Sequence, residues 1–167
     1  MRLFIALQPD DSLKEALSAV TDGMRAQGIR ANYVPEENLH ITLAFIGEVS
    51  AGMVPAIEEA ILNVPFEPLT LSLEGIGNFG NLLYAGLKES KPLMQYVSAL
   101  RRSLDENNIS YDRKKFKAHI TLARRVEGKH SFSVRMPEQT LTIPGVSLMR
   151  SDRVRGGMRY TEIGYYA

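Results

Sequence analysis

The segments His40-Ile41-Thr42-Leu43-Ala44 and His119-Ile120-Thr121-Leu122-Ala123 carry the same five residues at two places in this chain. Both are typical of β-strands in their aliphatic and β-branched content. Because the side chains of a strand alternate between its two faces, the first, third and fifth residues of each copy should share one face. We expect the second and fourth residues, together with Phe45 after the first copy, to point the other way into a core.

The repeat predicts one site built from two strands. The chain has only three histidines, and two of them begin the two copies. The copies start 79 residues apart, close to half of the 167 residues, which indicates an internal duplication although the halves are otherwise not alike. A chance repeat of a strand-forming sequence is the alternative, and a rare residue at the head of both copies argues against it. The third histidine, His130, lies in a polar stretch and is expected to take no part.

The composition fits one globular domain over residues 1–167, with room for a core and for two small lobes, since 44% of the residues are apolar. There is no cysteine, which excludes disulfides, thiolate metal sites and thiol nucleophiles. No stretch approaches the roughly 20 apolar residues of a membrane span. The apolar start over residues 3–7 is too short for a signal peptide. We therefore expect a monomer in the cytoplasm without a membrane partner.

The net charge of +1 hides an uneven distribution. Residues 1–100 contain 6 Lys and Arg against 12 Asp and Glu, whereas residues 101–167 contain 14 against 7. Basic residues flank the second histidine segment: Arg113, Lys114, Lys115 and Lys117 precede it, and Arg124 and Arg125 follow it. A basic half of this kind indicates an anionic ligand. Surface charge that serves solubility is the alternative.

Hydrophobic periodicity predicts three helices: one from Ser12 to Gly28, one after Ser50 that tolerates Pro55 only in its first turn, and one from Pro92 to Asn107. Strand-like runs fill the gaps: Leu3–Leu7, Arg30–Val34, His40–Phe45, Leu69–Glu74, Leu82–Leu87, His119–Arg124, Thr140–Met149 and Arg159–Tyr166. Residues 75–80 are rich in glycine and predict a hairpin turn, whereas residues 127–139 and 151–158 read as irregular. This order favours an α+β fold with largely antiparallel sheets over a doubly wound parallel one.

Two histidines and two threonines suit displacement at phosphorus. The ordinary pKa of histidine, about 6.5, lies close to neutral pH, so one ring can be neutral while another is protonated. One imidazole would remove a proton from the attacking water while the other gives a proton to the departing oxygen. Each threonine hydroxyl can donate a hydrogen bond to a phosphoryl oxygen. Such a site needs no metal and no other cofactor.

The quoted residues resemble the signature of the two-histidine phosphoesterases, in which a His-x-Thr-x segment occurs twice. The flanking residues are similar to the bacterial and archaeal RNA 2′,3′-cyclic phosphodiesterase branch, historically called 2′-5′ RNA ligase. The matching stretches are residues 2–7, 38–49 and 116–124, and the resemblance extends to the final strand-like run. It implies a bilobal α+β fold in which a pseudo-two-fold pair of antiparallel sheets lines a cleft and helices pack outside.

The resemblance also implies metal-independent hydrolysis of an RNA or nucleoside 2′,3′-cyclic phosphate to a 2′-phosphate, with ATP-independent 2′-5′ ligation as a side activity. Position by position, it makes His40 and His119 the acid–base pair and Thr42 and Thr121 the donors to the phosphate. Arg124 matches a basic residue common in this branch. Alternation places Arg124 on the face of Leu122, so it reaches the cleft only if the strand bends.

Other residues are candidates for holding RNA: Tyr33, Phe45, Phe79 and Tyr84 for stacking on bases, and Arg150, Arg153, Arg155 and Arg159 for phosphates. Core packing is the alternative for Phe45 and Tyr84. The function itself has two alternatives: a non-catalytic RNA-binding or nucleotide-binding module, and the same chemistry on another cyclic phosphate or a 2′-5′ oligonucleotide. The motif alone leaves open which histidine is the acid.

Overall fold

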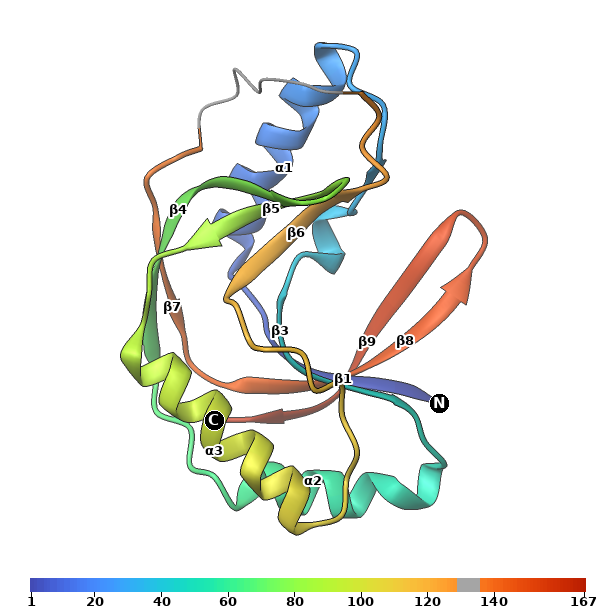
Figure 1. The fold of residues 1–167 in the computed structure, drawn as a ribbon, viewed down its shortest axis with the longest axis vertical. Helices are drawn as coiled ribbons and strands as arrows, with labels where there is room; N and C mark the ends of the chain where they lie inside the picture. Colours follow the sequence, from blue (N-terminus) through green and yellow to red (C-terminus); the bar gives the residue numbers. More distant parts are fainter. Residues whose placement is uncertain (129–135) are drawn as a thin grey trace.

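Figure 1 shows the fold of the computed structural model, which describes residues 1–128 and 136–167. His130 and most of the stretch 127–139 that we expected to be irregular lie outside the described residues. Over the described ranges, none of the helices is both long and apolar enough to cross a bilayer.

The described strands form two antiparallel sheets. The first has the strand order β3-β1-β8-β9, with β1 (Arg2–Leu7), β3 (Ile41–Glu48), β8 (Val146–Val154) and β9 (Gly157–Tyr166). The second has the order β2-β6-β5-β4-β7, with β2 (Asn32–Tyr33), β4 (Leu69–Phe79), β5 (Leu82–Leu87), β6 (His119–Arg124) and β7 (Thr140–Ile143). The first histidine segment therefore belongs to the first sheet and the second segment to the second sheet.

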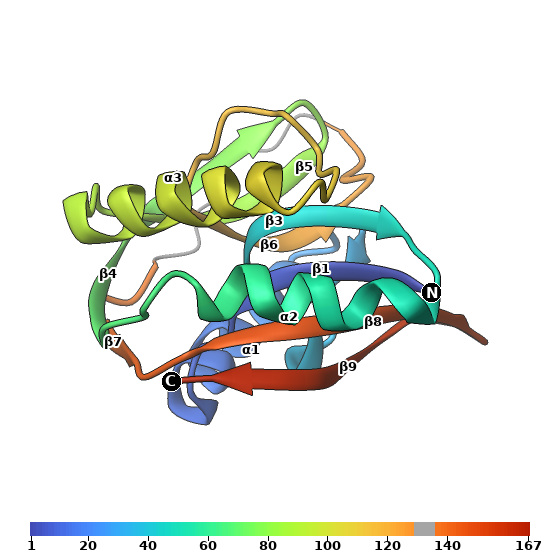
Figure 2. The same ribbon diagram turned by 90° about the horizontal axis from the view of Figure 1, so that it is seen from below.

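Helices α1 (Asp11–Ala26), α2 (Val54–Leu62) and α3 (Lys91–Glu106) pack outside the sheets (Figures 1 and 2). Helix α1 follows β1 of the first sheet but packs on the second, where its Met24 clusters with Leu83 and Ala123. Helix α3 follows β5 of the second sheet but packs against α2 and β3. Because α1 and α3 each pack on the lobe other than the one they follow in the chain, both lobes share one continuous core. The expected bilobal α+β fold is confirmed.

Several predicted element bounds are wrong. Residues 75–80 are not a turn, because β4 continues to Phe79 and pairs with β5. The run 140–149 breaks at Pro144-Gly145 into β7 and β8, which belong to different sheets; proline cannot donate to the ladder. Residues 151–158 are not irregular but form the turn end of the β8–β9 hairpin.

Strand β3 contains a β-bulge at Leu43. Thr42 and Ala44 pair with consecutive residues of β1, and Leu43 between them is left out of the register. The extra residue shifts the alternation, so Ala44 is buried in the core with Leu43, and Phe45 lies beside Thr42 in the cavities described below. The expectations that Ala44 shares the face of Thr42 and that Phe45 faces the core are therefore wrong, because strict alternation does not survive a bulge.

Strand β6 has the same bulge at Leu122, where Thr121 and Ala123 pair with consecutive residues of β5. Ala123 is fully buried against Met24 of α1 and does not share the face of His119. Arg124, which alternation alone places on the face of Leu122, consequently lies in the cleft. The bulge at Leu122 thus supplies the bend in β6 that brings Arg124 to the cleft.

Arg101 of α3 satisfies the backbone at the first bulge. Its Nε and Nη2 atoms donate to the carbonyl oxygen of Leu43 at 3.2 and 3.0 Å, and its Nη1 donates to the carbonyl oxygen of Lys114 at 2.7 Å. A bulge takes backbone groups out of the regular ladder. Arg101 therefore stabilises the bulge in β3 and ties to it the loop that leads to His119.

Replacing Arg101 by methionine should lower the free energy of unfolding by about 1–3 kcal/mol, because the carbonyl of buried Leu43 loses its donors. The measurement is urea denaturation followed by circular dichroism. Arg102→Met is the matched control, since Arg102 is exposed on the same helix, and it should change stability by less than about 0.5 kcal/mol. Equal stability of the two variants would contradict the role given to Arg101.

Candidate functional site

His40 lies directly before β3 and is held by the backbone. Its ring Nδ1 lies 2.7 Å from the carbonyl oxygen of Asn38, two residues earlier. Asn38 is itself buried, and its Nδ2 donates to the carbonyl oxygen of Met158 on β9 at 2.8 Å. The segment that carries His40 is thus pinned to the β8–β9 hairpin, although the two are far apart in the sequence.

His119, the first residue of β6, is held in the same way. Its Nδ1 lies 2.6 Å from the carbonyl oxygen of Lys117, again two residues earlier. The side chain of Lys117 donates from Nζ to the hydroxyl oxygen of Tyr84 on β5 at 3.0 Å. Both histidines therefore use a carbonyl at the same offset, and in both cases the residue that supplies it is tied to another strand, β9 for Asn38 and β5 for Lys117.

These hydrogen bonds fix the tautomer of each neutral ring. A carbonyl oxygen only accepts, so Nδ1 must carry the proton and Nε2 is left with its lone pair. In His40, Nε2 lies 2.7 Å from Oγ1 of Thr42, whose hydroxyl then donates to the ring. No matching bond joins His119 to Thr121 in the part of the chain that the structure describes. The two identical segments therefore differ in how their hydroxyls are engaged.

Each histidine lies against two aromatic rings. The His40 ring centroid is 4.9 Å from that of Phe4 and 5.3 Å from that of Tyr160. The His119 centroid is 5.4 Å from that of Phe79 and 5.4 Å from that of Tyr84. The first pair comes from β1 and β9 and the second from β4 and β5, so sheet pairing sets both environments.

Burial lowers the pKa of His40 from 6.5 to about 4. The hydrogen bond to the carbonyl of Asn38 opposes this shift, whereas the positive charges of Arg124, His119 and Lys14 lower the pKa of His40 further. His40 is therefore neutral at pH 7. The contribution of His119 means that the two imidazoles lie near enough to interact electrostatically.

Two cavities meet at the first motif. The His119 cavity, of about 840 Å³, is lined by His119, Phe79 and three lysines among others. The His40 cavity, of about 700 Å³, is lined by His40, Arg124 and residues of β1, β8 and β9. Thr42 and Phe45 line both cavities. The cleft thus runs from one histidine to the other past the hydroxyl of Thr42.

The remaining RNA candidates divide between the cleft and other surfaces. Phe79 is exposed and lines the His119 cavity, while Tyr84 is buried beneath it with the two rings stacked. Tyr33 lies elsewhere, because it packs against the cluster that contains Met24 of α1, and its hydroxyl donates to the carbonyl of Ile29. Of the four arginines proposed for phosphates, Arg153 lines the His40 cavity. The others are Arg150, which pairs with Asp152, and Arg155 and Arg159, which are exposed on the hairpin.

Three residues of the site were missed by sequence reasoning: Phe4, Tyr160 and Arg101. The first two flank His40 only because β1 and β9 lie in its sheet. Arg101 sits on the polar side of a helix and gives no sequence signal of its own. A contact made through sheet order or helix packing has no characteristic spacing in the chain.

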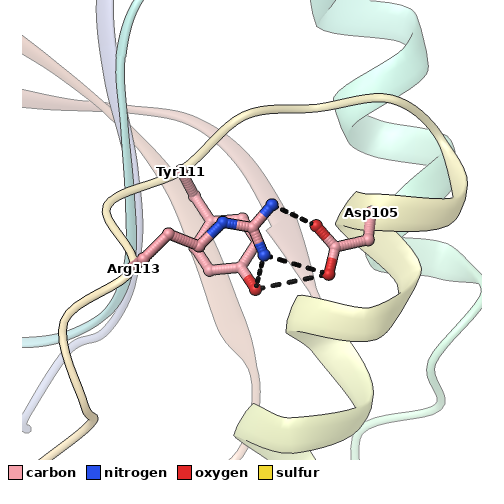
Figure 3. A network of polar contacts seen from close by, with 3 residues as sticks. All are labelled: Asp105, Tyr111 and Arg113. Carbon is pink, nitrogen blue, oxygen red and sulfur yellow. Dashed lines mark hydrogen bonds and ion pairs between the residues drawn. The ribbon is translucent and has the colours of Figure 1, made fainter.

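The loop between α3 and β6 is held at several points. Figure 3 shows Arg113 bound to both carboxylate oxygens of Asp105, at 2.6 and 3.2 Å, and to the hydroxyl of Tyr111 at 2.8 Å. The N–H of Asp112 donates to the carbonyl of Phe45 in β3 at 2.8 Å. Together with Arg101, these contacts attach the loop to α3 and to the first motif strand.

Comparison with known proteins agrees with this arrangement. A family model described as LigT-like phosphoesterase matches residues 7–88, a range that includes the first motif. An RNA 2′,3′-cyclic phosphodiesterase of Archaeoglobus fulgidus is 37% identical over 130 residues, which cover 74% of this chain and 72% of that protein.

Solved structures match over nearly the whole chain. The crystal structure of TT0787 of Thermus thermophilus has a TM-score of 0.84 and 27% identity over 99% of this chain and 97% of that one. The structure of E. coli LigT complexed with 3′-AMP has a TM-score of 0.81 and 26% identity over 99% and 96%. With its two motif histidines in cavities that meet at Thr42, this chain belongs to the LigT-like phosphoesterase family.

Proposed function

We propose that this protein hydrolyses the 2′,3′-cyclic phosphate end of RNA to a 2′-phosphate, with His40 as general base and His119 as general acid. The observation that carries the proposal is the hydrogen bond from each Nδ1 to a backbone carbonyl, which makes Nε2 the nitrogen of each ring that exchanges a proton with the substrate or water. The substrate class is supported by the activity named for the Archaeoglobus relative.

The assignment of base and acid rests on the different surroundings of the two rings. His40 is neutral at pH 7 because burial lowers its pKa to about 4, so its Nε2 can accept a proton from water. Water attacks phosphorus while the bond from phosphorus to O3′ breaks. The proton of the water passes to His40, and His119 gives its Nε2 proton to O3′.

Thr42 couples substrate binding to the base. In the free protein its hydroxyl donates to Nε2 of His40. When a phosphoryl oxygen arrives, the hydroxyl turns to donate to it, and the lone pair of Nε2 becomes available to water. Thr121 and Arg124 act on the same phosphate, as a hydrogen-bond donor and as a positive charge.

A non-catalytic binding module does not need two imidazoles held in one tautomer. A metal-dependent reaction is not favoured, because residues 1–128 and 136–167 contain no group of three or more His, Asp or Glu side chains placed to hold a metal ion. One two-lobed domain is supported by the core shared between the lobes. The monomeric state, the cytoplasmic location and the ligation activity stay predictions.

The decisive assay is incubation of the purified protein with RNA that ends in a 2′,3′-cyclic phosphate. We expect hydrolysis to a 2′-phosphate at the same rate with and without EDTA. The position of the phosphate is read by chromatography against authentic 2′-phosphate and 3′-phosphate standards. A 3′-phosphate product would reverse the leaving group, and loss of activity in EDTA would overturn the metal-independent mechanism.

Replacing either His40 or His119 by alanine should lower kcat by roughly 100- to 10,000-fold, the usual contribution of a general acid or base. His130→Ala is the matched control, since this third histidine lies in neither motif. Turnover rates on the same cyclic-phosphate substrate make the comparison. If one of the two motif variants turned over like the control, the paired mechanism would be wrong.

The pH profile of kcat/KM should have an acid limb with its midpoint near 4. Below that pH His40 gains a proton and no longer accepts one from water, so activity rises as the pH increases through the pKa of His40. At alkaline pH the acid loses its proton and activity falls again. Constant activity above about pH 9, or an acid midpoint near the ordinary histidine value of about 6.5, would contradict the assignment.

Arg124→Gln should raise the pKa of His40, because one of the positive charges that disfavour the imidazolium is removed. The pKa is measured by NMR titration of the His40 ring protons. Arg125→Gln removes the neighbouring, exposed charge and should leave the titration of His40 in place. Equal shifts in both variants would mean that Arg124 has no special proximity to His40.

A further inference from the structure

The proposed reaction fixes the side of the cleft on which the RNA must lie. In an in-line displacement, the attacking water and the leaving oxygen are on opposite sides of phosphorus. The leaving oxygen, O3′, remains attached to the terminal ribose. If His119 protonates O3′, the terminal nucleoside lies in the His119 cavity and water enters from the His40 cavity. This step rests on the proposed function.

The His119 cavity has a platform for a base. Phe79 is 43% exposed and stacks on Tyr84 with a centroid distance of 4.5 Å and an interplanar angle of 28°. One face of Phe79 is therefore supported by a buried ring, and the residue also lines the cavity. Such a supported, exposed ring can stack on any nucleobase.

The same cavity carries three exposed lysines: Lys114, Lys115 and Lys117. Within the described residues, neither Lys114 nor Lys115 forms an ion pair. Lys117 uses one donor on the hydroxyl of Tyr84, and its Nζ lies 5.2 Å from the Phe79 centroid. An ammonium group that has two donors left, next to a stacking platform, suits a phosphate that follows the stacked base.

The lysines stand on a loop that is held in place. Arg101 binds the carbonyl of Lys114, Asp112 accepts the N–H of Lys114 at 2.9 Å, and Arg113 is clamped to Asp105. A fixed backbone means that binding RNA orders side chains only, which lowers the entropic cost of binding. The anchoring of this loop is thus a second reason to treat it as a binding surface.

The His40 cavity differs from the His119 cavity in its charge and in its aromatic rings. It is smaller, and the acidic residues Glu48 and Asp152 line it beside three arginines, whereas the His119 cavity has one acidic residue, Asp112, beside its three lysines and Arg101. Its rings Phe4 and Tyr160 pack against each other and against His40. A cavity of mixed charge, whose aromatic rings already pack against each other, suits the entry of water better than the binding of a polyanionic RNA chain.

We propose that the His119 cavity is the binding site for the RNA strand, with the terminal base on Phe79 and the upstream phosphates on Lys114, Lys115 and Lys117. The protein consequently prefers the end of an RNA chain over a free nucleoside 2′,3′-cyclic phosphate. The terminal nucleotide fills the cavity, and the chain leaves it over the lysine loop.

The test compares a nucleoside 2′,3′-cyclic phosphate with a trinucleotide that has the same cyclic end. The double variant Lys114→Gln/Lys115→Gln should lower the ratio of kcat/KM for the trinucleotide to that for the mononucleotide by about tenfold. The salt slope of log kcat/KM for the trinucleotide should become shallower by roughly 0.7 for each phosphate that a lysine no longer neutralises. The charge-matched control, Arg155→Gln/Arg159→Gln at exposed positions of the β8–β9 hairpin, should leave the ratio at the wild-type value.

Phe79→Ala tests the platform separately and should raise KM for both substrates by roughly tenfold. Phe79→Leu keeps apolar packing on Tyr84, so an equal loss in the leucine variant shows that the flat ring is required. Circular dichroism checks that each variant is folded.

The outcomes of the lysine experiment test the RNA-binding inference separately from the proposed function. A wild-type protein with no preference for the trinucleotide, or a larger effect of the hairpin arginines than of the lysines, would overturn the inference while leaving the hydrolase intact. A protein that hydrolyses neither substrate would instead overturn the proposed function.

Discussion

Each motif histidine depends on one hydrogen bond, from ring Nδ1 to the carbonyl oxygen two residues earlier in the chain. This bond sets the orientation of the ring and decides which nitrogen faces the cleft. It works only because the segment before each strand is itself anchored, by Asn38 to β9 in one case and by Lys117 to Tyr84 in the other. The chemistry of the site is therefore built on backbone geometry that two distant strands maintain.

The two copies of one pentapeptide acquire different properties from their neighbours. His40 is enclosed by Phe4 and Tyr160 and lies near three positive charges, so its pKa falls to about 4. His119 lies beside an exposed ring and a lysine-bearing loop. A symmetric motif thus becomes an asymmetric site, with a half-buried neutral imidazole on one side and a basic surface on the other. An in-line reaction needs this asymmetry, because its two ends require opposite proton transfers.

The uneven charge of the sequence has a structural counterpart. The basic residues before the second motif do not form a diffuse surface: Arg113 is used to clamp the loop, while Lys114, Lys115 and Lys117 line the cavity. Arg101 performs a related task for the backbone, since it binds carbonyls of both the β3 bulge and the loop. Part of the positive charge therefore fixes the shape of the cleft, and the remainder is available to an anion.

The sequence by itself determined the fold class, the three helices, the strands that carry the motifs, and the identity of the two histidines and Thr42 that the cleft brings together. These follow from local pattern: helical period, strand alternation, and a rare residue repeated in identical surroundings. Strict alternation failed at Ala44, Phe45, Ala123 and Arg124, because each motif strand has a bulge whose extra residue is defined by pairing with a partner strand. Only the tertiary structure decided that Phe45 and Arg124 face the cleft, that Phe4 and Tyr160 enclose His40, and that the two histidines differ. The physical reason is that register, burial and electrostatic environment arise between segments that no sequence spacing connects.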